Sequence, residues 1–137
     1  MGASGTDTFD DDDAMDWIGA FLDAPSEELI YETLERARPY CESGAASQAL
    51  AAAEVVAFLR GAPSSGLLQM LEAHGTETFP LKRSPRHERL AIDAIDNISA
   101  ASELRNLWEE VEGWLPEWLA ALEDLRNRLT APPTISS

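Results

Sequence analysis

The sequence contains little cysteine and little histidine. Cys41 is the only cysteine among the 137 residues, so no disulfide can form within the chain. The two histidines and one cysteine cannot make the clustered Cys/His ligand set of a structural zinc site. The first residues do not show the basic and then apolar pattern of a secretory signal. These features favour a cytoplasmic protein, and they imply no metal and no cofactor.

Basic residues are also scarce, with 10 Lys and Arg against 25 Asp and Glu, which gives a formal net charge of −15. Nucleic-acid binding needs clustered cations, so we expect no nucleic-acid partner, whereas a basic protein partner fits this charge. The longest nearly apolar run, Ala49 to Leu59, contains Glu54 and is too short to span a bilayer, so we expect no membrane insertion. The oligomeric state is left open.

The apolar residues recur with helical periodicity in the first half of the chain. The first stripe is typical of an amphipathic helix and consists of Ala14, Trp17, Ile18, Phe21 and Leu22. Ser26 is expected to cap a second helix that Pro39 stops. Residues 46–59 are apolar on nearly every side, which places this third helix at the centre of a bundle.

The second half continues the pattern. It predicts a short helix over residues 67–73, a helix that Ser84 caps, and helices over 102–112 and 116–129. The apolar stripe of the predicted helix over residues 102–112 contains Leu104, Leu107, Trp108 and Val111, and we expect it to face inward. The fold class is therefore all-α, a single-domain helical bundle of about six or seven helices around a central apolar helix. We expect the domain to cover residues 1–131 and residues 132–137 to form a flexible tail.

Four consecutive aspartates, Asp10 to Asp13, precede the first stripe. They lack the glycine and glutamate spacing of an EF-hand calcium loop. They suit a helix N-terminus, where Asp12 or Asp13 can cap free N–H groups and the neighbouring charges interact favourably with the helix dipole. Asp16 lies beyond the reach of a cap and is the acid of this run that a function would most readily explain.

Glu54 is the other notable acid, because it lies within the apolar helix with Leu50 and Phe58 one turn away on either side. A carboxylate in such a position needs an arginine, a helix N-terminus or a metal, or it must reach the rim. A structural ion pair is the simpler interpretation, and a functional carboxylate is the alternative. Asp12, Asp16, Trp17 and Glu54 are therefore the candidate binding residues. No catalytic residue is identified.

Three weaker patterns complete the list of candidates. Two carboxylate pairs stand at i, i+3 and are of the type that holds magnesium in all-α nucleotide pyrophosphohydrolases, although solvated helix faces explain them equally well; they are Glu32 with Glu35 and Asp93 with Asp96. His74 and His87 have no partner motif and are interpreted as surface histidines. The single basic stretch contains Lys82, Arg83, Arg86 and Arg89. We prefer the interpretation that it faces the acidic surface of the protein itself. A phosphate or RNA site is the alternative, although no aromatic residues interleave with these cations.

Three blocks of the sequence resemble the bacterial domain-of-unknown-function family 4259. They are "GTDTFDDDDAMDW", "AAAEVVAFLRGAP" and "SELRNLWEE" with the later "LRNRL", and they occur in the expected order over most of the chain. The resemblance carries over positions including Phe9, Asp12, Ala14, Asp16, Trp17, Glu54, Leu104, Leu107 and Trp108. The family opening commonly has tryptophan where Ser4 stands and often asparagine where Asp11 stands. The resemblance implies a bacterial cytosolic domain and no reaction.

Together these observations favour a non-enzymatic protein-binding module with a basic partner, for which an immunity-type role against a nuclease toxin is one form. The alternative is a carboxylate-dependent metal-binding protein or hydrolase, in which Asp12, Asp16 and Glu54 supply the ligands. A third interpretation is a self-associating helical domain, because the four tryptophans can form an aromatic surface patch.

Overall fold

The computed structural model describes residues 8–38, 42–76, 80–111 and 113–130. These residues form seven α-helices and one short 3-10 helix, η2 (Thr8–Asp10), and no strand lies among them. The α-helices are α1 (Asp12–Asp23), α2 (Glu27–Glu35), α3 (Ser43–Leu59), α4 (Ser65–His74), α5 (Pro85–Ala100), α6 (Glu103–Glu109) and α7 (Leu115–Thr130). The expected all-α bundle is confirmed. The expected stop at Pro39 and the expected tail lie outside the described residues.

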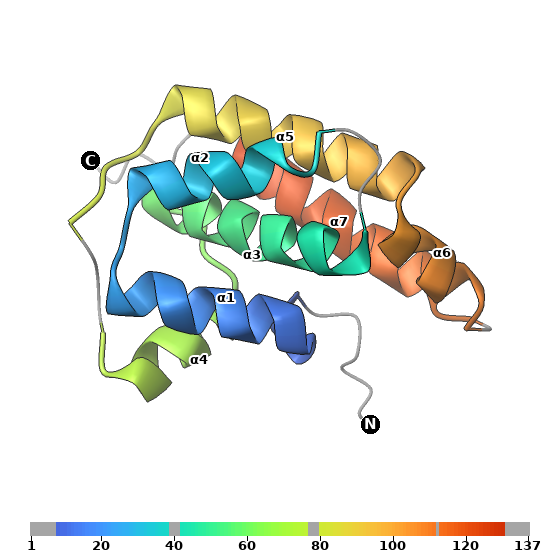
Figure 1. Ribbon diagram of the computed structural model, residues 1–137, viewed down its shortest axis with the longest axis horizontal. Helices are drawn as coiled ribbons and strands as arrows, with labels where there is room; N and C mark the ends of the chain where they lie inside the picture. The colour runs from blue at the N-terminus through green and yellow to red at the C-terminus, as the bar shows by residue number, and fades with distance from the viewer. Residues whose placement is uncertain (1–7, 39–41, 77–79, 112, 131–137) are drawn as a thin grey trace.

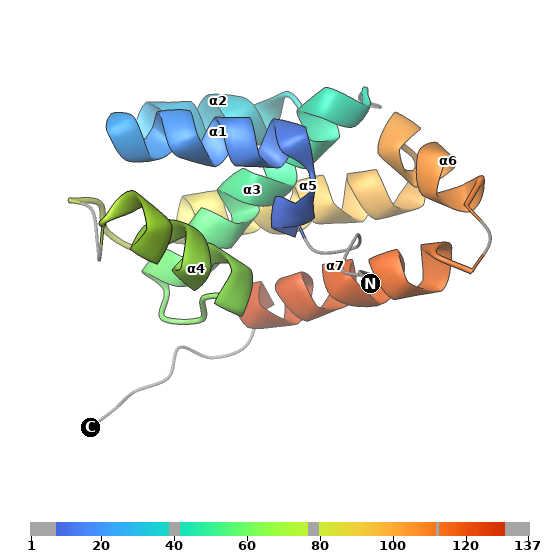
Figure 2. The same ribbon diagram turned by 90° about the horizontal axis from the view of Figure 1, so that it is seen from below.

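Helix α3 forms the centre of the bundle (Figure 1). In this view α2 and α5 lie above α3, α1 and α4 lie below it, and α6 covers one end. The view from below places α7 along the side of the bundle remote from α1 and α2 (Figure 2). Eleven of the 17 residues of α3 are buried, as the absence of a polar face predicts. Most of these buried side chains are alanine or valine, which allow neighbouring helices to approach closely.

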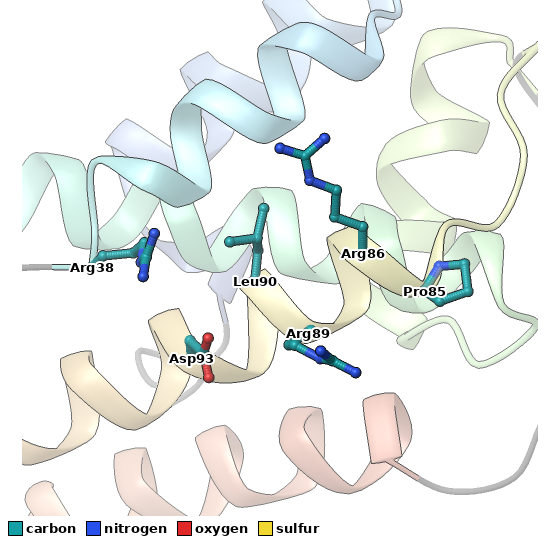
Figure 3. A pocket seen from close by; sticks show the side chains of 6 residues that line it. All are labelled: Arg38, Pro85, Arg86, Arg89, Leu90 and Asp93. Carbon is teal, nitrogen blue, oxygen red and sulfur yellow. The ribbon is translucent and has the colours of Figure 1, made fainter.

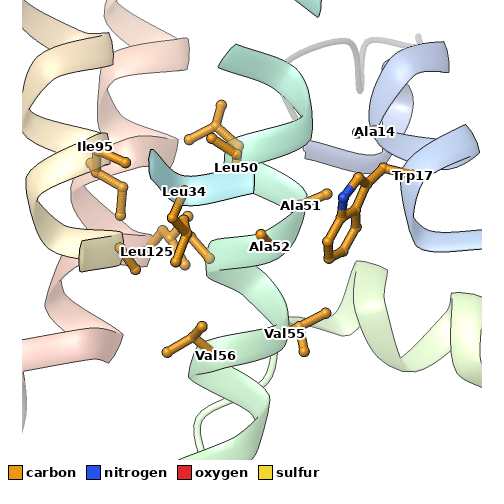
Figure 4. Close-up of a cluster of buried hydrophobic side chains, with 14 of the residues drawn as sticks. Ala14, Trp17, Leu34, Leu50, Ala51, Ala52, Val55, Val56, Ile95 and Leu125 are labelled. Carbon is orange, nitrogen blue, oxygen red and sulfur yellow. The ribbon is translucent and has the colours of Figure 1, made fainter. Parts of the chain in front are cut away.

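The first stripe of apolar residues forms the contact between α1 and α3. All five predicted positions, from Ala14 to Leu22, are buried. Figure 4 shows Trp17 beside Ala51 and Val55 of α3. The indole N–H of Trp17 donates a 2.9 Å hydrogen bond to the Thr33 hydroxyl, so this buried ring also joins α1 to α2 through a satisfied polar contact.

The predicted starts of α2 and α5 are confirmed, because Ser26 and Ser84 cap these helices. The predicted cap of α1 is wrong by one residue or two. The carboxylate of Asp11 accepts from the N–H groups of Asp13 and Ala14, at 2.8 and 3.2 Å. Asp11 has the extended backbone of a cap, whereas Asp12 and Asp13 are the first helical residues.

Two further expectations about burial are wrong. His87 is 8% exposed and therefore buried, because the first turn of α5 packs into the bundle. The stripe of α6 does not all face inward: Leu104 is buried, but Leu107 and Val111 are 46% and 44% exposed. Helix α6 is short and ends at Glu109, so Val111 lies beyond the helix that the stripe assumed. No helix among the described residues is both long and apolar enough to cross a membrane.

Candidate functional site

The carboxylate of Glu54 is bound by an arginine that lies 74 residues later in the sequence. Arg128 of α7 places its two terminal nitrogens 3.0 and 3.1 Å from the two Glu54 oxygens. Thr8 donates a longer, 3.4 Å hydrogen bond to the same carboxylate. Both side chains of the ion pair are largely buried, with 5% of Glu54 and 19% of Arg128 exposed. Such a two-fold contact is the strongest geometry available to these groups.

Arg128 is held by two further acceptors. Its guanidinium donates to the Ala62 carbonyl at 3.1 Å and to Asp124 at 2.9 Å. Burial alone lowers the pKa of Arg128, but the hydrogen bonds and charges of Glu54 and Asp124 outweigh this and raise the pKa. Gly61 has a positive φ of 89° in the turn that ends α3, and this turn presents the Ala62 carbonyl. The network therefore joins α7 to both α3 and the loop that follows it.

A second buried acid, Glu88 of α5, is bound by two arginines. Arg60 at the end of α3 donates to it at 2.7 Å, and Arg83 contacts it at 2.6 and 3.2 Å. The hydrogen bond to Glu88 raises the pKa of Arg83. The prediction that the basic stretch faces the protein's own acids is confirmed for Arg83. Arg86 instead lies with its guanidinium carbon 4.7 Å from the centre of the Tyr31 ring.

His87, next to this network, is a residue whose burial the sequence did not indicate. Burial lowers the pKa of His87, the positive charge of Arg86 lowers it further, and the charge of Glu27 acts in the opposite direction. Folding therefore disfavours protonation of this imidazole relative to that of a free histidine.

These two networks are closed. Among the described residues, no buried side-chain nitrogen or oxygen lacks a hydrogen-bond partner. A cation at Glu54 would have to displace the Arg128 guanidinium from both carboxylate oxygens. The geometry of Glu54 and Glu88 therefore serves the packing of α3, α5 and α7 rather than an open reaction site.

The four candidate residues from the sequence occupy different environments. Trp17 of α1 is buried and bonded to Thr33 of α2, and Glu54 is buried against α7. Asp12 and Asp16 are exposed on α1, and neither has an ion-pair partner among the described residues. The metal-ligand set of Asp12, Asp16 and Glu54 is thus not assembled in this arrangement.

In each of the two helical carboxylate pairs, one acid contacts an arginine of the protein. Glu35 pairs with Arg38, and Asp96 pairs with Arg126 at 2.8 Å. Within the described part of the chain, no group of three or more His, Cys, Asp or Glu side chains is placed to hold a metal ion. The pairs therefore lie on solvated helix faces, and one acid of each contacts a cation of the protein itself.

An apolar groove of about 200 Å³ lies between α1 and α4. Its lining residues are Met15, Ile18, Gly19, Leu22, Met70, Ala73 and His74. Met15 is 42% exposed. A Cβ atom at Gly19 would meet no other atom within 4 Å, so packing does not explain a glycine in the middle of this helix. Glycine there costs about 0.5–1 kcal/mol relative to alanine, and its visible effect is to keep the groove open.

The exposed acids of α1 border this groove. At about 100° per residue, the acids Asp12, Asp16 and Asp23 fall within about 40° of the helix circumference. Gly19 and Met15 lie immediately beside them on the groove side. A carboxylate oxygen of Asp23 is 3.5 Å from His74 Nε2, while Asp12 and Asp16 form no ion pair among the described residues. We call Asp12, Asp16 and Asp23 the acidic stripe.

The sequence matches the family described as Domain of unknown function (DUF4259) over residues 2–121. The chain belongs to the DUF4259 family. The resemblance stated from the three sequence blocks is thereby confirmed. No curated protein and no solved structure matches the chain. In this DUF4259 chain the matched region includes the acidic stripe and Glu54, whereas Arg128, which neutralises Glu54, lies beyond it.

Proposed function

We propose that this DUF4259 protein is a non-enzymatic binding module that takes a basic protein partner in the groove between α1 and α4. The proposal is carried by one observation: the acidic stripe runs beside an apolar groove, and two of its three acids form no ion pair within the described part of the chain. A basic amphipathic helix satisfies both features, since it offers apolar side chains to the groove and Lys or Arg to the stripe.

The chemistry of the lining supports this kind of occupant. Met15 and Met70 line the groove, and methionine side chains adapt to differently shaped apolar partners. A second copy of the chain fits less well, because two acidic stripes facing one another would repel. The net charge of −15 also favours rapid encounter with a basic protein. An immunity-type role, in which the bound partner is a basic toxin in the cytoplasm, is one form of this function.

The test compares matched variants in a pull-down at physiological salt with quantitative mass spectrometry. Asp12→Asn/Asp16→Asn removes charge from the stripe, and Glu117→Gln/Glu123→Gln removes the same charge from α7. We expect the wild type and the α7 variant to retain the same basic protein, and the stripe variant to retain about tenfold less. Equal retention by both variants, or no retained protein, would count against the proposal.

A second pair of variants tests the groove itself. Gly19→Gln inserts a side chain into the groove, whereas Ala20→Gln adds the same side chain at the next, exposed position of α1. We expect Gly19→Gln to weaken binding of the partner and Ala20→Gln to leave it unchanged. Circular dichroism melting checks that both variants remain folded. If the two variants bind alike, the partner does not use the groove.

A further inference from the structure

A second hollow, of about 420 Å³, lies along the contact between α2 and α5, on the other side of α3 from the acidic stripe (Figures 1 and 3). Its lining residues are Arg38, Pro85, Arg86, Arg89, Leu90 and Asp93. The volume is within the range of about 300–1,000 Å³ that is usual for small-molecule sites. Three of the ten basic residues of this acidic chain therefore line one hollow. We call it the arginine hollow.

Two of these three arginines have no carboxylate partner in the part of the chain that the structure describes. Arg38 contacts Glu35 at 3.1 Å, but Arg86 and Arg89 form no ion pair among the described residues. Asp93 is one helical turn after Arg89, at the spacing that often gives a salt bridge, yet the two side chains are not paired. Although the chain has 25 acids, the positive charges of Arg86 and Arg89 are available to an anionic ligand.

The hollow is also shaped to orient a ligand. The contact of Arg86 with the Tyr31 ring limits the freedom of its guanidinium before any ligand binds. Figure 3 shows Leu90 between Arg38 and Arg86, so an apolar surface separates these two cations. Pro85 is the first residue of α5, and the positive end of this 16-residue helix adds to the field of the arginines.

We propose that the arginine hollow binds a small phosphate ester that carries hydroxyl groups. Arg86 holds the phosphate oxygens, for which the planar guanidinium is suited. Arg89, whose side chain points away from Arg86 in Figure 3, adds positive charge beside the hollow. Asp93 accepts a hydrogen bond from a ligand hydroxyl, and Leu90 contacts the carbon skeleton. A nucleic-acid strand is a poor occupant, because the net charge of −15 repels a polyanion and the Tyr31 face is covered by Arg86.

The test is a calorimetric titration of the full chain with ribose 5-phosphate, inorganic phosphate and ribose at constant ionic strength. We expect saturable binding of ribose 5-phosphate, weaker binding of inorganic phosphate and no binding of ribose. Arg86→Gln should weaken binding of the ester by about tenfold or more, and Arg89→Gln should weaken it by less, because its charge acts from a greater distance. Arg36→Gln removes the same charge from α2 outside the hollow and should change affinity by less than about twofold.

Asp93→Asn separates recognition of the hydroxyl from the effect of charge. It should strengthen the binding of inorganic phosphate, because a nearby negative charge is removed, and it should not strengthen the binding of the ester to the same extent. Absence of saturable binding, or equal losses in Arg36→Gln and Arg86→Gln, would overturn the proposal. Melting curves and amide NMR spectra of each variant show whether a loss of affinity is instead a loss of fold.

Discussion

Replacing Arg128 by methionine should reveal how strongly the buried charges of this bundle depend on one another. The change keeps an unbranched side chain but removes every donor to Glu54, Asp124 and the Ala62 carbonyl. Glu54 then keeps one 3.4 Å hydrogen bond from Thr8. A buried charge that loses its partner costs about 3–5 kcal/mol, which is a large part of the stability of about 5–15 kcal/mol that a domain possesses.

This free energy corresponds to a large change in melting temperature. With an unfolding entropy of about 2.1 cal/mol/K per residue, a chain of 137 residues has an unfolding entropy of about 0.29 kcal/mol/K. A loss of about 3–5 kcal/mol therefore lowers the melting temperature by about 10–17 °C. Urea unfolding, followed by circular dichroism, measures the free energy itself.

Arg126 supplies the matched control, because it is on the same helix and also makes a two-fold contact, with Asp96, through Nε and one terminal nitrogen at 2.8 and 3.3 Å. Its side chain is 43% exposed, and that of Asp96 is 50% exposed. Arg126→Met should cost only about 0–1 kcal/mol, and less in high salt. If Arg126→Met and Arg128→Met destabilise the protein equally, the argument from burial is wrong.

A double variant separates the cost of a buried charge without a partner from the cost of the lost contact. Glu54→Leu/Arg128→Met removes both charges together, so no carboxylate is left buried without a partner. We expect it to be more stable than Arg128→Met alone, with a coupling of about 2 kcal/mol or more between the two positions. Additive losses would instead show that the two side chains act independently.

Three smaller predictions concern other parts of the bundle. Trp17→Phe should cost about 1–3 kcal/mol because the Thr33 hydroxyl loses its buried N–H donor; Thr33→Val in the same background should then add less than it does alone in urea unfolding. Asp11→Ala should cost about 1 kcal/mol through the loss of the cap, while Asp12→Ala stays within about 0.5 kcal/mol. Burial lowers the pKa of His87 in the folded protein, so the unfolded chain takes up a proton first as the pH falls. The free energy of unfolding should therefore be highest above about pH 6.5 and decrease below it. His87→Gln should reduce this dependence of the melting temperature on pH.

The local features of the fold could be predicted because their causes are local. The apolar period of α1 places Trp17 on the inner face whatever its neighbours are, and Ser26 and Ser84 cap helices through groups three residues away. The cap of α1 was harder to assign, because consecutive aspartates are chemically equivalent and only the backbone angles distinguish Asp11 from Asp12. Local chemistry thus predicted the start of this helix to within one or two residues.

The features that position the candidate sites depend on distant residues. The sequence shows that a buried Glu54 needs a partner, but Arg128 is 74 residues away and nothing in the spacing selects it from the other arginines. Leu107 shows that an apolar stripe can also mislead. Its place in the stripe predicted burial, but the sequence did not indicate that α6 is short and leaves this side chain exposed. The arginine hollow likewise exists only because Arg38, just after α2, lies beside α5, which supplies the rest of the lining.

The closed networks also determine where a function can be sought on this protein. Glu54 and Glu88 were the most unusual acids by burial, yet their charges are fully answered by arginines and contribute to holding α3, α5 and α7 together. Among the described residues, two groups of charges without ion-pair partners lie beside a hollow of the surface and have opposite sign: Asp12 and Asp16 beside the groove of α1, and Arg86 and Arg89 at the start of α5. A basic protein and a small phosphate ester would therefore bind on opposite sides of the bundle, with α3 between them. Because α3 is packed closely on both sides, binding at one face should leave affinity at the other unchanged unless that helix moves, and titrating the ester in the Asp12→Asn/Asp16→Asn variant measures this directly.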